Sequence, residues 1–135
     1  MKKYNILLVE DDAGISGLVE EYMKEALNFV TEIDIFVDGK TALSQSYEKK
    51  YDLVITDFRL PSINGLDLIK KIRQNTLNES TPVIFMSAYF SEMETMSISV
   101  KLKNMVFMTK PFSPEGLARK VKLLLLSNSK NENQD

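Results

Sequence analysis

Short apolar runs rich in β-branched residues alternate along the chain with longer segments of helical periodicity, and this alternation limits the folds open to it. Five runs pair with five helical segments, which is typical of a parallel sheet wrapped by helices. Most runs are continuously apolar, as expected for strands that helices cover on both faces. We therefore expect an α/β fold: a single doubly wound, five-stranded parallel sheet of strand order 2-1-3-4-5, with five helices. The expected strands span residues 4–9, 31–37, 52–56, 82–87 and 105–108.

The helical segments carry apolar stripes and start signals. The stripe of the first helix consists of Ile15, Leu18, Val19, Tyr22, Ala26 and Leu27. Start signals follow the third, fourth and fifth strands: Asn64 before Gly65, Ser91 with Glu94 as a capping box, and Ser113 before Pro114. The last helix, from residue 114 to about 127, places on one side Leu117, Ala118, Val121, Leu124 and Leu125. We expect one domain over residues 1–127, and a disordered tail or the start of a linker over 128–135, where nothing apolar can be buried.

Composition excludes several function classes. The 17 basic and 19 acidic residues leave a formal charge of -2, without a basic block that could neutralise phosphates, so direct nucleic-acid binding is not expected. The chain has no cysteine and no histidine, which excludes thiolate metal sites and a histidine base. Its apolar runs fall short of the roughly 18 residues that span a bilayer. A cytoplasmic protein without a membrane partner is the simplest interpretation.

Polar residues follow four of the expected strands. Glu10, Asp11 and Asp12 follow the first strand, Asp57 the third, Ser87 ends the fourth, and Lys110 follows the fifth. An acidic triplet alone is more often a solvated helix N-terminus than a metal site. In the expected strand order, however, the first and third strands are neighbours, so their carboxylates meet at the edge where open parallel sheets bind ligands.

Carboxylates held close together stay ionised only if a cation lies among them or their pKa values rise. Mg²⁺ prefers such oxygen ligands and combines them with water and phosphate oxygens. The Ser87 hydroxyl and the Lys110 ammonium suit the oxygens of a transferred phosphoryl group instead. A carboxylate nucleophile, a cation, a lysine and a hydroxyl together indicate phosphoryl transfer, with Asp57 as acceptor.

Four motifs, each at the end of an expected strand, resemble the receiver domain of bacterial response regulators of two-component signalling. The matching residues run from about 3 to 127 and comprise the segments 6–12, 52–57 with Leu60-Pro61 and Asn64-Gly65, 86–88, and Lys110-Pro111-Phe112. The resemblance implies that Asp57 takes a phosphoryl group from the phosphohistidine of a histidine kinase or a histidine phosphotransfer protein. It also implies a chain that acts as a switch rather than as an enzyme.

The resemblance also assigns roles around the acceptor. Asp11 and Asp12 would hold Mg²⁺ together with Asp57 and the backbone carbonyl of Arg59. Lys110 would pair with the phosphoryl group, and Ser87 would move to bond it. Phe107 matches the aromatic switch position, although a ring in an apolar strand is core by default, and Lys110-Pro111 would be a cis peptide.

Two further positions matter for the lifetime of the phosphoryl group in this family. They are Arg59, two residues after Asp57, and Tyr89, two residues after Ser87. Both side chains are bulky and would obstruct an attacking water, so we expect slow self-dephosphorylation. The Gly-Ala pair that usually precedes strand five is replaced by residues 101–104, where Asn104 is expected to adopt the left-handed cap.

Partners and alternatives stay open at this point. We expect Met86 and Met108 in the core, whereas Met93, Met96 and Met105 are candidates for an output face formed by helix four, strand five and helix five. The downstream target is unknown, and a phosphorylation-linked homodimer is one form of output. The alternative functions are a phosphate-independent binding module, or degenerate receiver, and an aspartyl-phosphate phosphatase of the haloacid-dehalogenase type. The phosphatase is disfavoured because its acid/base aspartate would stand where the chain has Arg59.

Overall fold

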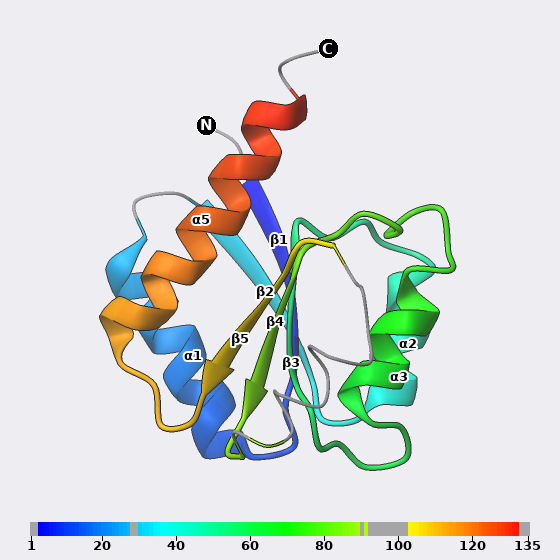
Figure 1. Ribbon diagram of the computed structural model, residues 1–135, viewed down its shortest axis with the longest axis horizontal. Coiled ribbons are helices and arrows are strands. Elements are labelled where there is room, and N and C mark those ends of the chain that lie inside the picture. The colour runs from blue at the N-terminus through cyan, green and yellow to red at the C-terminus, as the bar shows by residue number, and fades with distance from the viewer. Residues whose placement is uncertain (1–2, 28–29, 90, 92–102, 133–135) are drawn as a thin grey trace.

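The five expected runs form one parallel sheet in the computed structural model, which describes residues 3–27, 30–89, 91 and 103–132 (Figure 1). The strands are β1 (Lys3–Val9), β2 (Val30–Phe36), β3 (Leu53–Asp57), β4 (Val83–Ser87) and β5 (Met105–Thr109). Their order is β2-β1-β3-β4-β5, and every pairing is parallel. The expected sheet is confirmed, and each strand boundary lies within one residue of its expected position.

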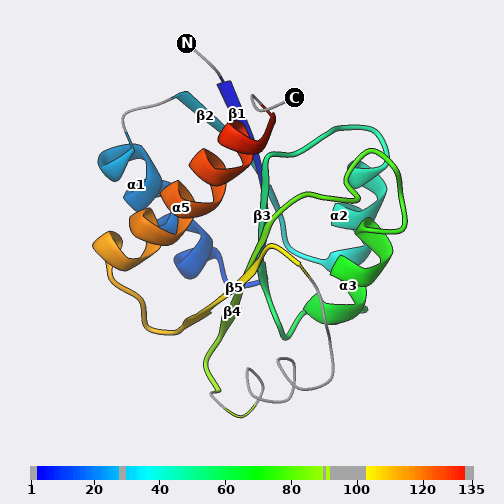
Figure 2. The same cartoon turned by 45° about the horizontal axis from the view of Figure 1, so that its top comes forward.

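Helices cover both faces of this sheet. The helices α1 (Ala13–Ala26) and α5 (Pro114–Glu132) lie on one face, and α2 (Gly39–Ser46) and α3 (Gly65–Ile72) lie on the other (Figures 1 and 2). Four helices thus fall within the described residues. The fifth, expected between β4 and β5 with a capping box at Ser91 and Glu94, falls largely on residues outside them. In the part of the chain that the structure describes, no helix has the length and apolarity needed to cross a membrane.

Two hydrophobic cores, one on each face, explain why the strands are continuously apolar. Successive side chains of a strand point to opposite faces. In β1, Ile6 and Leu8 join the core beneath α1 and α5, while Leu7 and Val9 join the core beneath α2 and α3. Every residue of β3 and β4 is buried. Burying one such aliphatic side chain contributes about 1.5–3 kcal/mol, so packing between the two helix layers stabilises the sheet.

The described helix starts follow the sequence signals, but one helix end does not. The Asn64 side chain accepts a hydrogen bond from Asp67 N at 2.8 Å at the start of α3, and Ser113 Oγ accepts one from Gly116 N at 2.9 Å at the start of α5. The expected end of α5 near residue 127 is too early, because the helix continues to Glu132. Residues 128–132 contain neither glycine nor proline, so nothing in them stops a helix.

The apolar stripe of α1 is narrower than expected. Leu18 is 43% exposed, whereas Val19 and Met23 are buried and the small Ser16 is only 7% exposed. Successive helical residues are about 100° apart, so Leu18 lies on the flank when Val19 faces the sheet. The placement of Leu18 in the core stripe is therefore corrected, and Met23 takes its place.

Two backbone features agree with expectations at the ends of β5. Asn104 has the left-handed φ of 55° that the sequence predicted for the residue before the strand. The Lys110-Pro111 peptide after the strand is cis, as the resemblance implied. The chain therefore enters and leaves β5 by defined turns, and the second of these turns carries Lys110.

A buried asparagine ties the loop after α3 to the segment after α2. Asn78 is 1% exposed; its Oδ1 accepts from Tyr51 N at 2.8 Å, and its Nδ2 donates to the carbonyls of Ser46 at 2.7 Å and Lys49 at 2.9 Å. The Asn78→Ala variant would remove the hydrogen bonds of Tyr51 N and Lys49 O to Asn78, while Ser46 O would still accept from Asn75 Nδ2 at 3.1 Å. We expect the variant to lose about 2–4 kcal/mol of unfolding free energy. Urea denaturation measures this loss. The exposed Gln74→Ala is the control; equal midpoints for the two variants would contradict the prediction.

Candidate functional site

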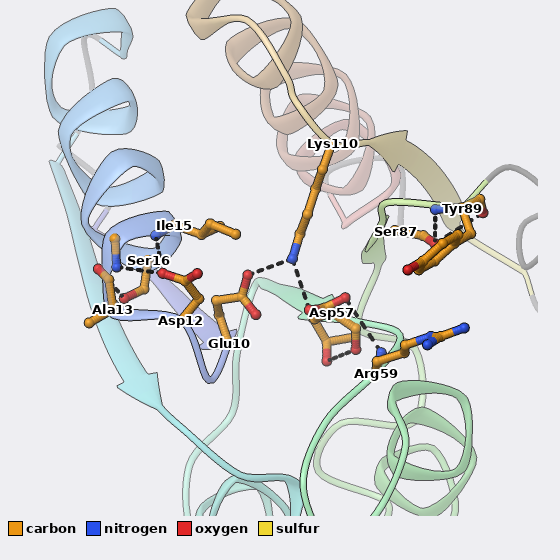
Figure 3. A network of polar contacts seen from close by, with 12 residues as sticks. Glu10, Asp12, Ala13, Ile15, Ser16, Asp57, Arg59, Ser87, Tyr89 and Lys110 are labelled. Atoms are coloured by element: carbon orange, nitrogen blue, oxygen red, sulfur yellow. Dashed lines mark hydrogen bonds and ion pairs between the residues drawn. The ribbon is translucent and has the colours of Figure 1, made fainter.

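The polar side chains singled out from the sequence gather at the carboxyl edge of the sheet (Figure 3). Asp57 is the last residue of β3, Glu10 follows β1, and Ser87 is the last residue of β4. Lys110 follows β5 and reaches across β4 toward Glu10 and Asp57. Four strands thus deliver side chains from distant parts of the sequence to one place.

Lys110 lies between two carboxylates. Its Nζ is 2.8 Å from Asp57 Oδ2 and 2.6 Å from Glu10 Oε1, and its side chain is 15% exposed (Figure 3). Burial alone would lower the pKa of Lys110, but the hydrogen bonds to Asp57 and Glu10 outweigh it and raise the pKa above its ordinary value. The ammonium therefore stays charged and holds both carboxylates in place.

Glu10 was placed in the acidic triplet by the sequence, but it was given no role of its own at the site. Its side chain is fully buried, and its Oε2 has no hydrogen-bond partner among the described residues. Burial raises the pKa of Glu10 to about 7, with Asp57 adding to the rise and Lys110 opposing it. Burying a carboxylate with only one of its two oxygens paired costs folding free energy, unless a second positive group binds the other oxygen. Its position directly after a continuously apolar strand was the available signal.

The carboxylates that come together differ from the expected set by one residue. Glu10, Asp11 and Asp57 each place an oxygen within 4.8 Å of the others. Asp12 instead caps α1, where its Oδ1 accepts from Gly14 N at 2.8 Å and Ile15 N at 3.2 Å (Figure 3). The site thus offers three carboxylate oxygens, which are hard ligands, and one positive charge, that of Lys110. This combination of ligands and charge fits Mg²⁺.

A second layer of contacts lies beside Asp57. Ser87 Oγ donates to Tyr89 O at 3.1 Å and accepts from Tyr89 N at 3.0 Å. The guanidinium of Arg59 lies over the Tyr89 ring, 4.4 Å from its centroid, while Arg59 N approaches Asp57 Oδ1 at 3.4 Å (Figure 3). The structure thus links the loops after β3 and β4 through an Arg–Tyr stack next to the carboxylates.

Phe107, the expected switch residue, is half-buried in β5. Its ring stacks on Phe85 with centroids 6.0 Å apart, on the side of the sheet covered by α2 and α3. Met86 and Met108 are buried as expected, and Met105 is half-buried near Phe107. Met93 and Met96 lie outside the described residues. The environment of Phe107 is that of a core residue at the edge of its cluster, and its switching role stays a prediction.

The pKa of Glu10 gives the metal-free protein a distinct pH dependence. The folded chain keeps a proton on Glu10 up to about pH 7, whereas the unfolded chain loses it near the ordinary value of 4.5. The stabilisation of the folded state by this bound proton is therefore fully present below about pH 4.5, and it is lost as the pH rises through about 7. With EDTA present, we expect the free energy of unfolding measured in urea to fall between about pH 4.5 and pH 7, by up to about 1.4 kcal/mol per pH unit. The Glu10→Gln variant should lose this slope; an unchanged slope would contradict the prediction.

Comparison with known proteins identifies the family. Residues 6–122 match the response regulator receiver domain, and the chain belongs to this family. It is 32% identical over 131 residues to the probable transcriptional regulator ycf29 of Porphyra purpurea, covering 95% of this chain and 59% of the relative. It is 35% identical over 121 residues to the response regulator ArlR of Staphylococcus epidermidis, covering 90% of this chain and 52% of the relative.

The fold agrees with solved receiver domains. The receiver domain of the sensor histidine kinase PA1611 from Pseudomonas aeruginosa, described with a magnesium ion in its active-site cleft, superposes with a TM-score of 0.80. It is 22% identical and is covered to 98%, with 92% of this chain aligned.

These comparisons define the class of the protein. Receiver domains are regulators rather than classical enzymes, and they interact with histidine kinases and with downstream targets. The chain spans between about half and three fifths of the length of the two curated relatives described above.

Proposed function

We propose that the chain is the phosphoacceptor of a two-component system, in which Asp57 takes a phosphoryl group from a histidine kinase or a histidine phosphotransfer protein. The observation that carries the proposal is the position of Lys110, whose ammonium contacts both Asp57 and the buried Glu10 at the carboxyl edge of the sheet. A fixed cation beside a nucleophilic carboxylate can stabilise the charge that develops on a transferred phosphoryl group.

We propose that the cluster of three carboxylates at the sheet edge binds Mg²⁺. Glu10, Asp11 and Asp57 supply oxygen ligands, and the backbone carbonyl of Arg59 is a further ligand by family resemblance. The Asp12 carboxylate caps α1, so we propose Glu10 in place of Asp12 as the second carboxylate ligand from the acidic triplet. Glu10 Oε2, which has no hydrogen-bond partner within the described part of the chain, supports this choice, as does the magnesium ion described for the PA1611 receiver domain. When bound, the ion neutralises the carboxylates and orients phosphoryl oxygens.

The reaction needs little more than positioning. A carboxylate oxygen of Asp57 attacks phosphorus, the new P–O bond forms as the P–N bond to the donor imidazole breaks, and the imidazole leaves with the electron pair. Lys110 exchanges part of its contact with Asp57 for a phosphoryl oxygen, so its charge is already in place. Ser87 must release the backbone of Tyr89 before its hydroxyl can bond the phosphoryl group.

We propose that the Arg59–Tyr89 stack slows self-dephosphorylation by covering the approach of water to Asp57. An exposed cation–π contact is worth about 0.5–1 kcal/mol, so removing it should speed loss of the phosphoryl group roughly two- to fivefold. The decay rates of phosphorylated Arg59→Ala and Tyr89→Ala chains in Mg²⁺ measure this effect, and the double variant should decay no faster than the faster single variant. Tyr47→Ala, which removes another exposed tyrosine, is the control. If all variants lost the phosphoryl group at the natural rate, the proposal that the stack shields Asp57 from water would be wrong.

Phosphorylation is proposed to change the surface of helix four, β5 and α5 that binds downstream partners. The segment expected to form helix four lies largely outside the described residues. Phe107 and Met105 lie on β5 next to this surface, and movement of Ser87 toward the phosphoryl group would free space near the Phe107 ring by family analogy. Partner binding or a phosphorylation-linked homodimer is the output, with no nucleic acid or membrane contact by this domain. A cytoplasmic location follows from this role.

The proposed function is tested by incubating the chain with a small acyl phosphate and Mg²⁺ and measuring its intact mass. We expect the mass of one added phosphoryl group, and none when EDTA removes the metal. A chain that gains no phosphoryl group from any donor, including a kinase phosphohistidine, would instead be a phosphate-independent binding module.

A further inference from the structure

We propose that Gly65 is a positioning residue for Asp57, and that Gly39 supports it through Ile63. In this view the missing side chain of Gly65 lets α3 pack directly on the backbone of the phosphoacceptor. The inference rests on the proposed function, because its effect is read in the phosphorylation of Asp57.

Gly65 makes the closest backbone approach to the candidate acceptor. A Cβ atom on Gly65 would lie 2.2 Å from Asp57 O and 3.1 Å from both Asp57 C and Phe58 Cα. Contacts below about 3 Å force atoms apart, and here the obstacle is backbone rather than a flexible side chain. The φ angle of Gly65 is not positive, so glycine is required for the close approach and not for a special conformation.

The backbone that Gly65 touches is fixed on several sides. Gly65 N donates to Phe58 O at 2.8 Å, and Phe58 N donates to Met86 O at 3.0 Å in β4. Thr56 Oγ1 donates to the same Asp57 carbonyl at 3.0 Å. Displacing residues 57 and 58 therefore disturbs the contact between Asp57 Oδ1 and Arg59 N, as well as the orientation of the carboxylate itself.

A second glycine, at the start of α2, packs closely against the loop between β3 and α3. A Cβ atom on Gly39, the first residue of α2, would lie 2.1 Å from Ile63 Cγ2 and 3.1 Å from Ile63 O. Ile63 belongs to the loop between β3 and α3, so α2 presses on the segment that leads into Gly65. The two contacts differ in kind: the obstacle at Gly39 is a side-chain methyl group that a substitution can remove, whereas the obstacle at Gly65 is backbone.

The test compares three Gly→Ala variants by their rate of phosphorylation with a small acyl phosphate, across a range of Mg²⁺ concentrations. In the Gly65→Ala variant, the loop must move by close to 1 Å, and a misplacement of about 1 Å near a reacting group can cost about 100-fold in rate. We expect at least a tenfold loss of rate at saturating Mg²⁺, together with a higher Mg²⁺ concentration for half-maximal rate. Gly17→Ala, where a Cβ meets nothing within 4 Å, should keep the natural rate.

The Gly39→Ala variant separates positioning from loss of folding. We expect it to slow phosphorylation, and we expect Gly39→Ala with Ile63→Ala to recover most of the rate, because the second change removes the clashing methyl group. Circular dichroism at the assay temperature must show each scored variant folded. If Gly65→Ala does not fold, the Gly39 and Ile63 variants decide the question. Natural rates in folded Gly65→Ala, or in Gly39→Ala, would overturn the inference. Failure of the natural chain to be phosphorylated would instead overturn the proposed function.

Discussion

The Asp57→Asn variant is expected to accept no phosphoryl group from any donor under conditions in which the natural chain is fully modified. Asparagine has nearly the same shape as aspartate, but its amide cannot serve as the nucleophile. The fold should survive, because the substitution removes one of three crowded carboxylates. The loss of activity should therefore be complete without a loss of stability. Intact mass after incubation with an acyl phosphate and Mg²⁺, with thermal melting alongside, measures both.

The matched control for this prediction is Asp67→Asn. Asp67 is an exposed carboxylate in the first turn of α3, and its change should leave phosphorylation at the natural rate. The Asp57→Asn variant also removes a group that raises the pKa of Glu10, so the stability of its metal-free form should depend less on pH. Residual phosphorylation of Asp57→Asn at any rate comparable to the natural chain would place the acceptor on another residue.

The Lys110→Met variant is expected to lose about 100- to 1000-fold in phosphorylation rate, the range found when one fixed donor to a developing negative charge is removed. Methionine keeps much of the side-chain volume, so the change removes mainly the charge. Glu10 and Asp57 then face each other without their cation, and the pKa of Glu10 should rise further. Single-turnover rates at saturating Mg²⁺ measure the kinetic loss.

The control for Lys110→Met is Lys71→Met, because it makes the same chemical change at an exposed position in the last turn of α3. It should match the natural chain in rate and in stability. A Lys110→Met chain that is phosphorylated within a few-fold of the natural rate would show that Lys110 has only a structural role in pairing with Glu10.

The acidic triplet shows how far sequence reasoning reached at the site. Strand order and strand ends were enough to bring Asp57 and Lys110 together, because β3 and β5 are separated by β4 alone and the lysine side chain is long enough to reach across it. Which members of Glu10-Asp11-Asp12 face the sheet edge depends on the residue at which α1 begins. Since α1 begins at Ala13, Asp12 becomes the N-cap and its carboxylate is used by the helix. The buried position then falls to Glu10.

Other features depended on packing that no local pattern encodes. The rotation of α1 that exposes Leu18 is set by how the helix lies on the sheet, not by its own periodicity. The close approach of Gly65 to Asp57 joins residues of two adjacent elements and has no signature beyond a glycine after a helix cap. By contrast, the left-handed Asn104 and the cis Lys110-Pro111 peptide could be expected, the first because few residues adopt that conformation and the second from family resemblance.

The most direct test of the central claim is to locate the phosphoryl group on the chain. The natural protein would be phosphorylated with an acyl phosphate in Mg²⁺, treated with borohydride to convert the aspartyl phosphate into a stable homoserine, and mapped by peptide mass spectrometry. The predicted result is a single modified residue, Asp57, in the Mg²⁺ sample and none in the EDTA sample. Modification at another carboxylate, or equal modification with and without the metal, would contradict the account.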